Sequence, residues 1–204
     1  EQDLKRRTAR LTLEQFQAIR KAAEPELQIA MDVALYSLQR RGDLVQLTKT
    51  AVSASAEPWT LEVSPSKAEK RDVCTSESRC REGPGLRSAL QAALAFEVPC
   101  PFLLARKPSR QRHGASKAHW AQWTPNLLSK RFAAAREASG ACEDLDATER
   151  PGFHQIRALG AHLYEEAGYP RGYVQVLLGH SSTRMTEHYQ EGHVVRWSEA
   201  EAGL

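Results

Sequence analysis

The spacing of apolar residues along the chain predicts mainly helices, and the first begins close to the start. Thr12-x-x-Gln15 has the form of a capping box, in which each side chain bonds the backbone N–H of the other residue. Leu13, Phe16 and Ile19 then recur on one helical face. These residues predict a first helix with one buried side.

A second apolar series predicts a helix from Glu26 to about Arg40, introduced by Pro25 and interrupted at Gly42. A short apolar turn of helix is expected to follow over residues 44–47. Further helices, with glycine, proline or capping residues near their ends, are predicted farther along the chain. Their approximate ranges are 86–96, 125–139, 156–167, 171–178 and 183–190.

Residues that favour strands lie near Val52 and again at Thr60–Val63, and Ser53–Pro58 forms a turn-rich connection between them. They predict a small sheet between about Leu47 and Val73. Polar segments at 74–85, 107–119 and 141–152 are expected to be loops. The fold class that follows is α+β, mainly α, in which a helical domain carries a small antiparallel β-sheet.

Composition narrows the class of protein without identifying it. Hydrophobic residues make up 41% of the 204, which is enough for one ordinary core. No apolar run approaches the roughly 18 to 20 residues that span a bilayer, and Glu1–Arg10 lacks the apolar region of a signal peptide. The cysteines form no CxxC pair, so we expect free thiols in a reducing cytoplasm; they are Cys74, Cys80, Cys100 and Cys142.

The net charge of +3 says little, but the distribution of charge says more. From Val98 to Arg136 there is no acidic residue, and Trp120 and Trp123 lie among the basic ones. Such a stretch would attract a phosphate backbone, although it is equally consistent with a solvated basic surface. The eight basic residues are Arg106, Lys107, Arg110, Arg112, Lys117, Lys130, Arg131 and Arg136.

Several separate segments carry residues that suit phosphoryl transfer. His154 and Arg157, at i and i+3, fall on one face near a helix start, where backbone N–H groups favour an anion. A guanidinium matches two phosphate oxygens, and a second arginine from the distant segment Gln39–Leu44 would hold the others. A nearby tyrosine would be a nucleophile that forms a covalent phosphoryl intermediate. His180 and Tyr189 follow, in that order, toward the end of the chain.

Each of these elements has a simpler explanation when it is taken alone. A His-x-x-Arg pair is more often solvated or capping, and a Gly-His step usually ends a helix. Arg40 and Arg41 could complement the dipole at a helix end, and a lone tyrosine usually packs. The combined order and spacing favour a shared site.

The ordered set Arg40-Arg41-Gly42-Asp43-Leu44, His154-x-x-Arg157, Leu177-Leu178-Gly179-His180 and Tyr189 resembles the active-site signature of the tyrosine recombinase family, in its lambda-type phage integrases. The resemblance covers most of the chain and is weakest between Arg71 and His119. It also extends to segments outside the signature, which are Arg10-Leu11-Thr12, Phe132–Arg136 and Phe153–Glu165.

The resemblance implies a transesterification that needs no metal, ATP or other cofactor. Tyr189 would attack a scissile DNA phosphate and leave a 3′-phosphotyrosyl bond and a free 5′-hydroxyl. Arg40 and Arg157 would hold the non-bridging oxygens, His154 would assist the tyrosine, and His180 would hydrogen-bond the phosphate. The family's general acid is a hairpin lysine. Lys67 stands at that place, with Lys70 as the alternative and a plain turn lysine as the simpler interpretation.

The implied partner is double-stranded DNA at recombination sites. We expect a homo-tetramer on DNA that is weakly associated or monomeric without it, in a cytoplasmic, DNA-associated protein of bacterial or phage origin. Residues 1–204 would form the catalytic domain, without the N-terminal DNA-clamping domain of full-length members. The tail Val194–Leu204 would dock on a neighbouring protomer or fold back on its own domain.

Three other functions are weighed against this one. A type IB topoisomerase-like relaxing enzyme shares the catalytic set, and a DNA-binding module without catalysis would not need Tyr189. A metalloenzyme built on His180, His188 and His193 is disfavoured, because their spacing matches no HExxH-type motif.

Overall fold

The structure of the protein is a computed structural model that describes residues 8–55, 59–63, 84–108 and 117–179. Helices dominate these residues, as the apolar spacing predicts. In chain order the elements are α1 (Leu13–Ala22), α2 (Pro25–Ser37), α3 (Arg41–Leu44), the 3₁₀ turn η1 (Lys49–Ala51), β1 (Val52–Ser53), β2 (Thr60–Leu61), α4 (Pro84–Ala95), α5 (Pro125–Ser139), α6 (Gln155–Glu166) and α7 (Arg171–Leu178).

The predicted capping box at the start of α1 is confirmed. The backbone N–H of Gln15 donates to the Thr12 Oγ1 at 3.1 Å, and the N–H of Thr12 donates to the Gln15 Oε1 at 3.1 Å. Phe16 and Ile19 are buried on the helix face that packs against α5. Leu13, which the sequence also predicts on the buried side, is instead 40% exposed. Local capping chemistry and a shorter apolar stripe therefore place α1 close to where the sequence predicts it.

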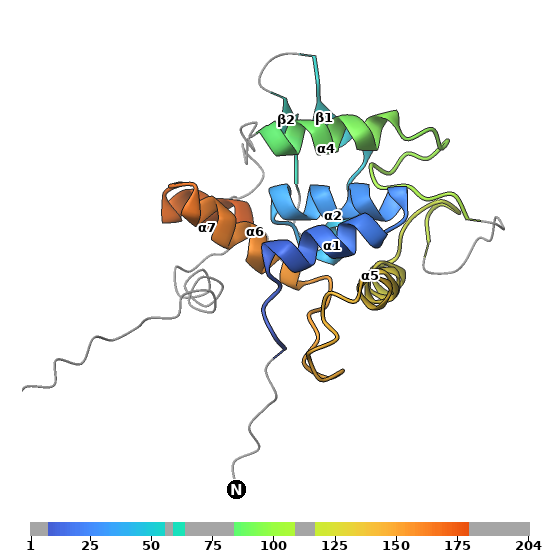
Figure 1. Cartoon of the computed structure of the whole chain (residues 1–204). Helices are drawn as coiled ribbons and strands as arrows, with labels where there is room; N and C mark the ends of the chain where they lie inside the picture. The colour runs from blue at the N-terminus through green and yellow to red at the C-terminus, as the bar shows by residue number, and fades with distance from the viewer. Residues whose placement is uncertain (1–7, 56–58, 64–83, 109–116, 180–204) are drawn as a thin grey trace, which may run out of the picture.

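Helix α2 forms the centre of the described structure. Figure 1 shows it with α4 above and with α6 and α7 to its left, and it contacts α1, α4, α5 and α6. Its buried residues include Leu27, Met31 and Leu35, so almost every side of this helix faces protein. A helix that is apolar nearly all round belongs in a core.

The end of α2 differs from the prediction of a helix to about Arg40 with a break at Gly42. The helix ends at Ser37, because Leu38 adopts a left-handed conformation with φ 55°. That conformation costs about 1–2 kcal/mol in a residue with a Cβ. Leu38 is 0% exposed, and complete burial of a leucine contributes roughly 1.5–3 kcal/mol, which offsets the cost. Gly42 instead lies inside α3, which begins after Arg40 and ends at Leu44, the first residue of the predicted turn over 44–47.

The predicted small antiparallel sheet is confirmed as the pair β1 and β2. Val52 pairs with Leu61, and Ser53 pairs with Thr60. Leu61 is buried against the main core, which ties this hairpin to the helices. The part of the predicted sheet beyond Val63, including the segment around Lys67, lies outside the described residues.

The later helices closely follow their predicted bounds. Helix α4 begins slightly early, at Pro84 rather than Leu86. Helix α5 is capped by Thr124 and closed by Gly140 at φ 68°, and α7 is closed by Gly179 at φ 57°. Both glycines occupy the left-handed position that favours a residue without a Cβ. The predicted helix over 183–190 lies outside the described residues.

One arrangement that the sequence did not predict is an extended segment between residues 101 and 106. On one side, the N–H of Lys49 donates to Pro101 O at 2.8 Å, and the N–H of Leu103 donates to Leu47 O at 2.8 Å. On its other side, Arg106 N donates to Ala121 O at 3.1 Å. Residues 47–49 and 121–122, far apart in sequence, are thereby linked through this segment. In the described residues no helix is long and apolar enough to cross a membrane, and Cys100 and Cys142 are free and buried.

Helices α2 and α6 pack closely together at Gly160. A Cβ at this position would lie 2.3 Å from the Leu35 carbonyl oxygen and 2.5 Å from the Leu38 Cδ2. The first neighbour is backbone and cannot rotate away. Only glycine therefore allows α6 to pack at this distance from α2.

We predict that Gly160→Ala lowers the free energy of unfolding by about 1–3 kcal/mol, because the added methyl overlaps the backbone of α2. Gly172→Ala in α7 is the matched control, since its Cβ would meet nothing within 4 Å. There we expect an increase of about 0.5–1 kcal/mol from helix propensity. Urea unfolding measures both. Equal effects at the two positions would contradict the close approach.

Candidate active site

Arg157 is the most deeply buried arginine described, with 2% of its surface exposed. Helix α6 carries it into the core, where Nη1 donates to the Leu38 carbonyl and Nη2 donates to the Leu178 carbonyl. Leu38 follows the end of α2, and Leu178 is the last residue of α7. Carbonyls at helix C-terminal ends lack intrahelical partners and carry partial negative charge. One guanidinium therefore joins the ends of two helices.

Gln39 makes a second connection between the same two helix ends. Its Nε2 donates to Ser37 O at 2.7 Å and to Leu177 O at 3.0 Å, and the residue is 8% exposed. Arg40 comes next in the chain and is the N-cap of α3. The two connections together fix the backbone that leads into Arg40 and the end of the helix that precedes His180.

His154 lies beside a group of arginines. It is the N-cap of α6 and its side chain reaches solvent, yet neighbouring atoms desolvate its ring. Desolvation is the first cause that lowers the pKa of His154, and repulsion from nearby arginines adds to it. These are, in decreasing order of effect, Arg157, Arg40, Arg41 and Arg10. The imidazole is therefore held toward its neutral form, which can accept a proton.

The lowered pKa of His154 also fixes the sign of its effect on stability. Its pKa is lower in the folded chain than the ordinary 6.5, so the unfolded chain binds more protons as the pH falls below that value. The contribution of His154 to stability is therefore lost as the pH falls from about 6.5 toward the folded pKa. Protonation opposes folding at this position.

The expected attraction of an anion to the start of α6 is not supported. The first N–H groups of the helix are already used, because Gln155, Ile156 and Arg157 donate to the carbonyls of Gly152, Phe153 and His154 at 2.9, 3.2 and 3.2 Å. These three N–H groups bond to carbonyls of the turn that leads into the helix. These N–H groups are therefore not free donors for an anion, and the structure shows the arginines as the positive charges that act on His154.

The structure brings together three of the predicted site residues. Arg40, His154 and Arg157 lie in one region, since both arginines act electrostatically on His154 and Arg157 binds the carbonyl of Leu38, two residues before Arg40. The other predicted residues, Lys67, His180 and Tyr189, lie outside the described residues, as do Lys70, His188, His193 and the tail Val194–Leu204. No group of three or more potential metal ligands occurs within the described residues. Sequence reasoning assigned no role to Gln39 or Arg10. Arg10 stands inside a segment that resembles the family, and Gln39 directly precedes one.

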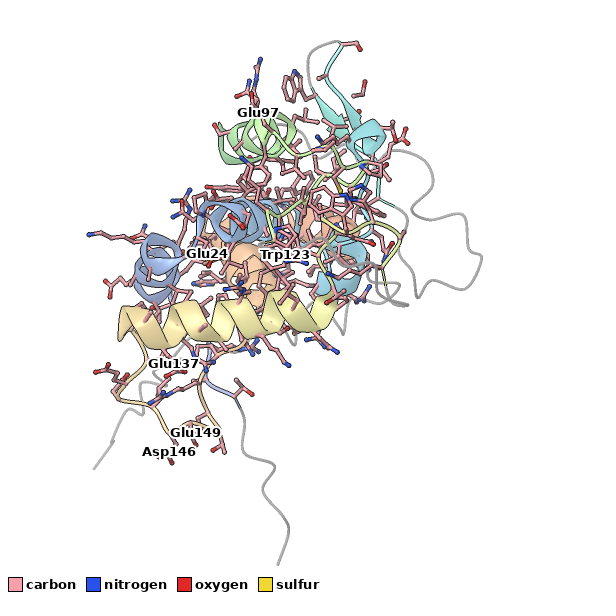
Figure 2. All side chains as sticks on the ribbon, turned by 90° about the vertical axis from the view of Figure 1, so that its right-hand side faces the viewer. Glu24, Glu97, Trp123, Glu137, Asp146 and Glu149 are labelled. Carbon is pink, nitrogen blue, oxygen red and sulfur yellow. The ribbon has the colours of Figure 1, made fainter. Side chains whose placement is uncertain are left out.

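The predicted basic stretch is only partly a basic surface. Trp123 is 1% exposed, and its Nε1 donates to Ala105 O at 3.2 Å, so it belongs to the core. Arg131 pairs with Glu24 at 3.1 Å, and Arg136 pairs with Glu137 at 2.7 Å. Figure 2 shows Glu137, Asp146 and Glu149 on the side of α5 away from Trp123. Acidic partners therefore compensate one part of the stretch.

Comparison with known proteins defines the class to which this fold and site belong. The profile of the phage integrase family matches residues 9–194, and the chain therefore belongs to that family, whose members are tyrosine recombinases. The integrase of Escherichia phage HK022 is 29% identical over 203 residues, which cover 96% of this chain and 50% of that protein. The chain thus spans about half the length of the relatives that it matches.

Solved structures show the same fold. A lambda integrase tetramer bound to a Holliday junction matches with a TM-score of 0.68 at 24% identity, over 96% of this chain and 51% of that one. The catalytic core of lambda integrase matches with a TM-score of 0.61 at 24% identity, over 84% of this chain and 95% of that one. The mainly helical fold with a small sheet is therefore that of the integrase catalytic core.

We predict that Arg157→Met lowers the free energy of unfolding by roughly 3 kcal/mol, because two buried carbonyls lose their donor. Arg41→Gln is the matched control, since Arg41 is exposed and, in the part of the chain that the structure describes, makes one side-chain hydrogen bond, to Ser129 Oγ at 2.6 Å. Its effect should stay within about 0.5 kcal/mol. Chemical denaturation compares the two. A small effect of Arg157→Met on the free energy of unfolding would show that Arg157 does not hold the ends of α2 and α7 together.

A second prediction concerns the arginines around His154. Arg41→Gln should raise the pKa of His154, because one of the charges that disfavour the imidazolium is removed. An NMR titration of the histidine Hε1 signals measures this shift. Arg171→Gln on α7 serves as the control and should leave that pKa unchanged. An unchanged or lower value in Arg41→Gln would show that the arginine does not act on this histidine.

Proposed function

We propose that this chain is the catalytic domain of a site-specific DNA recombinase that cuts and rejoins strands through Tyr189. The observation that carries the proposal is the meeting of Arg40, His154 and Arg157, which come from distant parts of the sequence. Clustered guanidinium groups suit a phosphoryl-transfer transition state, because its negative charge is spread over several oxygens. Membership of the phage integrase family supports the same chemistry.

In the proposed reaction the Tyr189 Oη attacks the scissile phosphorus, and a 3′-phosphotyrosyl bond forms as the bond to the 5′-oxygen breaks. Arg40 and Arg157 stabilise the non-bridging oxygens, and His180 donates a hydrogen bond to the phosphate. Neutral His154 accepts the tyrosine proton, in keeping with its lowered pKa. Lys67, or Lys70 in the alternative register, gives a proton to the departing 5′-oxygen.

The covalent link conserves the energy of the phosphodiester bond. Rejoining is then the reverse attack by a 5′-hydroxyl, and it needs neither ATP nor a metal. The histidine and lysine supply the proton transfers that a free tyrosine, with a pKa of about 10, would otherwise lack at neutral pH.

The proposed substrate is double-stranded DNA at paired recombination sites, cut by a tetramer of the whole protein. Support comes from the fold shared with lambda integrase, which one structure holds as a tetramer on a Holliday junction. Residues 1–204 would be the catalytic part of that protein, since they match nearly all of the lambda catalytic core. Action on bacterial or phage DNA would place it in the cytoplasm, associated with DNA.

The test is a DNA substrate with a nick beside the cleavage position, which traps the covalent intermediate. We predict that the wild-type chain forms a covalent protein–DNA adduct and that Tyr189→Phe forms none while still binding the DNA. The lost hydroxyl is the nucleophile, so binding should survive without chemistry. A denaturing gel with labelled DNA measures the adduct.

Tyr169→Phe is the control, since Tyr169 is a 38% exposed tyrosine next to α7 and should keep adduct formation. An adduct that persists in Tyr189→Phe would show that another residue is the nucleophile. The absence of an adduct from wild type on every cognate site would overturn the catalytic claim.

A further inference from the structure

A second concentration of positive charge lies away from the arginines around His154, at the side chains of Arg106 and Lys117. Arg106 ends the extended segment 101–106, and its backbone is held by the bond to Ala121 O and by the pairing of Ala105 with Gln122. Lys117 comes just before Ala118, whose N–H donates to the Gln122 Oε1 at 2.9 Å. The segment that ends at Arg106 and the segment that begins at Lys117 are therefore linked to each other through Ala121 and Gln122.

Gln122 connects this backbone to the proposed active site. It is 3% exposed, and its Nε2 donates to Val45 O at 3.1 Å. Val45 is the C-cap of α3, the short helix that starts directly after Arg40. Helix α5 makes a parallel connection, because Ser129 accepts a hydrogen bond from Arg41. The Arg106–Lys117 pair is thus held at a fixed position relative to Arg40.

Neither cation has an acidic partner in an ion pair within the described residues. Among the described residues, Arg106 makes one side-chain hydrogen bond, a long one from Nη2 to Trp120 O at 3.5 Å. Its Nε is buried and has no hydrogen-bond partner among the residues that the structure describes. The nearby basic residues differ in this respect, since Arg131 and Arg136 both pair with glutamates. Within the described residues, Arg106 and Lys117 therefore lack the direct ion pairs that Arg131 and Arg136 make.

The local environment disfavours the two charges. Desolvation is the first cause that lowers the pKa of Arg106, followed by repulsion from Arg131, while Glu26 acts in the opposite direction. Desolvation and then repulsion from Arg106 lower the pKa of Lys117. Two like charges that are partly desolvated gain most from an anion placed between them. The acidic side chains Glu137, Asp146 and Glu149 lie on the far side of α5 in Figure 2 and do not supply it.

We propose that Arg106 and Lys117 form a second phosphate-binding position, which holds the backbone of duplex DNA apart from the phosphate that is cut. Half-buried Arg106 presents a guanidinium whose stem is already packed, so little side-chain freedom is lost on binding. The link through Gln122 and Val45 to α3 lets one duplex engage this position and Arg40 together. Such a contact sets the register of DNA on the protein and reads no sequence. The position lies outside the proposed catalytic set and rests on the proposed function only in taking DNA as its ligand.

The test measures binding of the full 204-residue chain to a duplex that contains no recombination site, over a salt range of about 50–200 mM. Arg106→Gln and Lys117→Gln should each weaken binding about threefold to tenfold at low salt. Each should also reduce the slope of log affinity against log salt by up to about 1, as expected when one phosphate contact is lost. The double variant should lose less than the product of the two effects, because both side chains serve one phosphate.

Arg171→Gln is the control for a general charge effect, because it removes one positive charge from exposed Arg171 on α7, which is in an ion pair with Glu165 at 3.6 Å. Its affinity and salt slope should equal those of wild type. Equal losses in all three variants would indicate a general charge effect and overturn the site. Failure of wild type to bind duplex at low salt would overturn it as well. Where Arg106→Gln proves unstable, Lys117→Gln carries the test.

Inorganic phosphate distinguishes a duplex site from a site for a small anion. One outcome is that phosphate raises the melting temperature of wild type but not of Arg106→Gln, while the two proteins have the same salt slope on duplex DNA. In that case the site binds a small ion and the DNA inference is wrong. The adduct assay keeps the two proposals separate. If wild type forms the adduct but Arg106→Gln and Lys117→Gln leave the salt slope unchanged, this site alone is overturned. If the two variants alter the salt slope but wild type forms no adduct, the catalytic proposal alone is overturned.

Discussion

The arrangement of the proposed site depends on one buried guanidinium. Arg157 bonds the Leu38 and Leu178 carbonyls, and these close two helices that are far apart in sequence. Gln39 reinforces the same junction through Leu177. Without these bonds the ends of α2 and α7 would present unpaired carbonyls inside the protein, which is costly. The residue expected to contact phosphate is therefore also the residue that holds its surroundings together.

The nature of these partners matters for charge. A backbone carbonyl satisfies an N–H donor without cancelling the positive charge, whereas a carboxylate would do both. Arg157 thus keeps its influence on its neighbours, and with Arg40, Arg41 and Arg10 it depresses the pKa of His154. Structural anchoring and a strong positive potential can coexist at one residue for this reason. The same principle explains why Arg131 and Arg136, which pair with glutamates, contribute less to the basic surface than their number suggests.

Elements that are marked by short-range chemistry could be predicted from the sequence. The capping box of α1 and the terminal glycines Gly140 and Gly179 need no knowledge of distant residues. The end of α2 could not be predicted, because the left-handed Leu38 is held by burial in the assembled core. The order and spacing of the motifs predict Arg40, His154 and Arg157 as site residues. The role of Gln39 was not, since its partner carbonyl lies 138 residues away in the chain.

Gly160 constrains how the protein can respond to a partner. Because α6 touches the backbone of α2 there, neither helix can slide or turn past the other without overlap of backbone atoms. The two helices therefore form one stiff unit, with Arg157 on it and Arg40 attached to its end. When a partner as large as a duplex engages this unit, accommodation cannot come from between these helices. In the function proposed here, any adjustment has to come from the duplex itself or from parts of the protein outside this pair of helices.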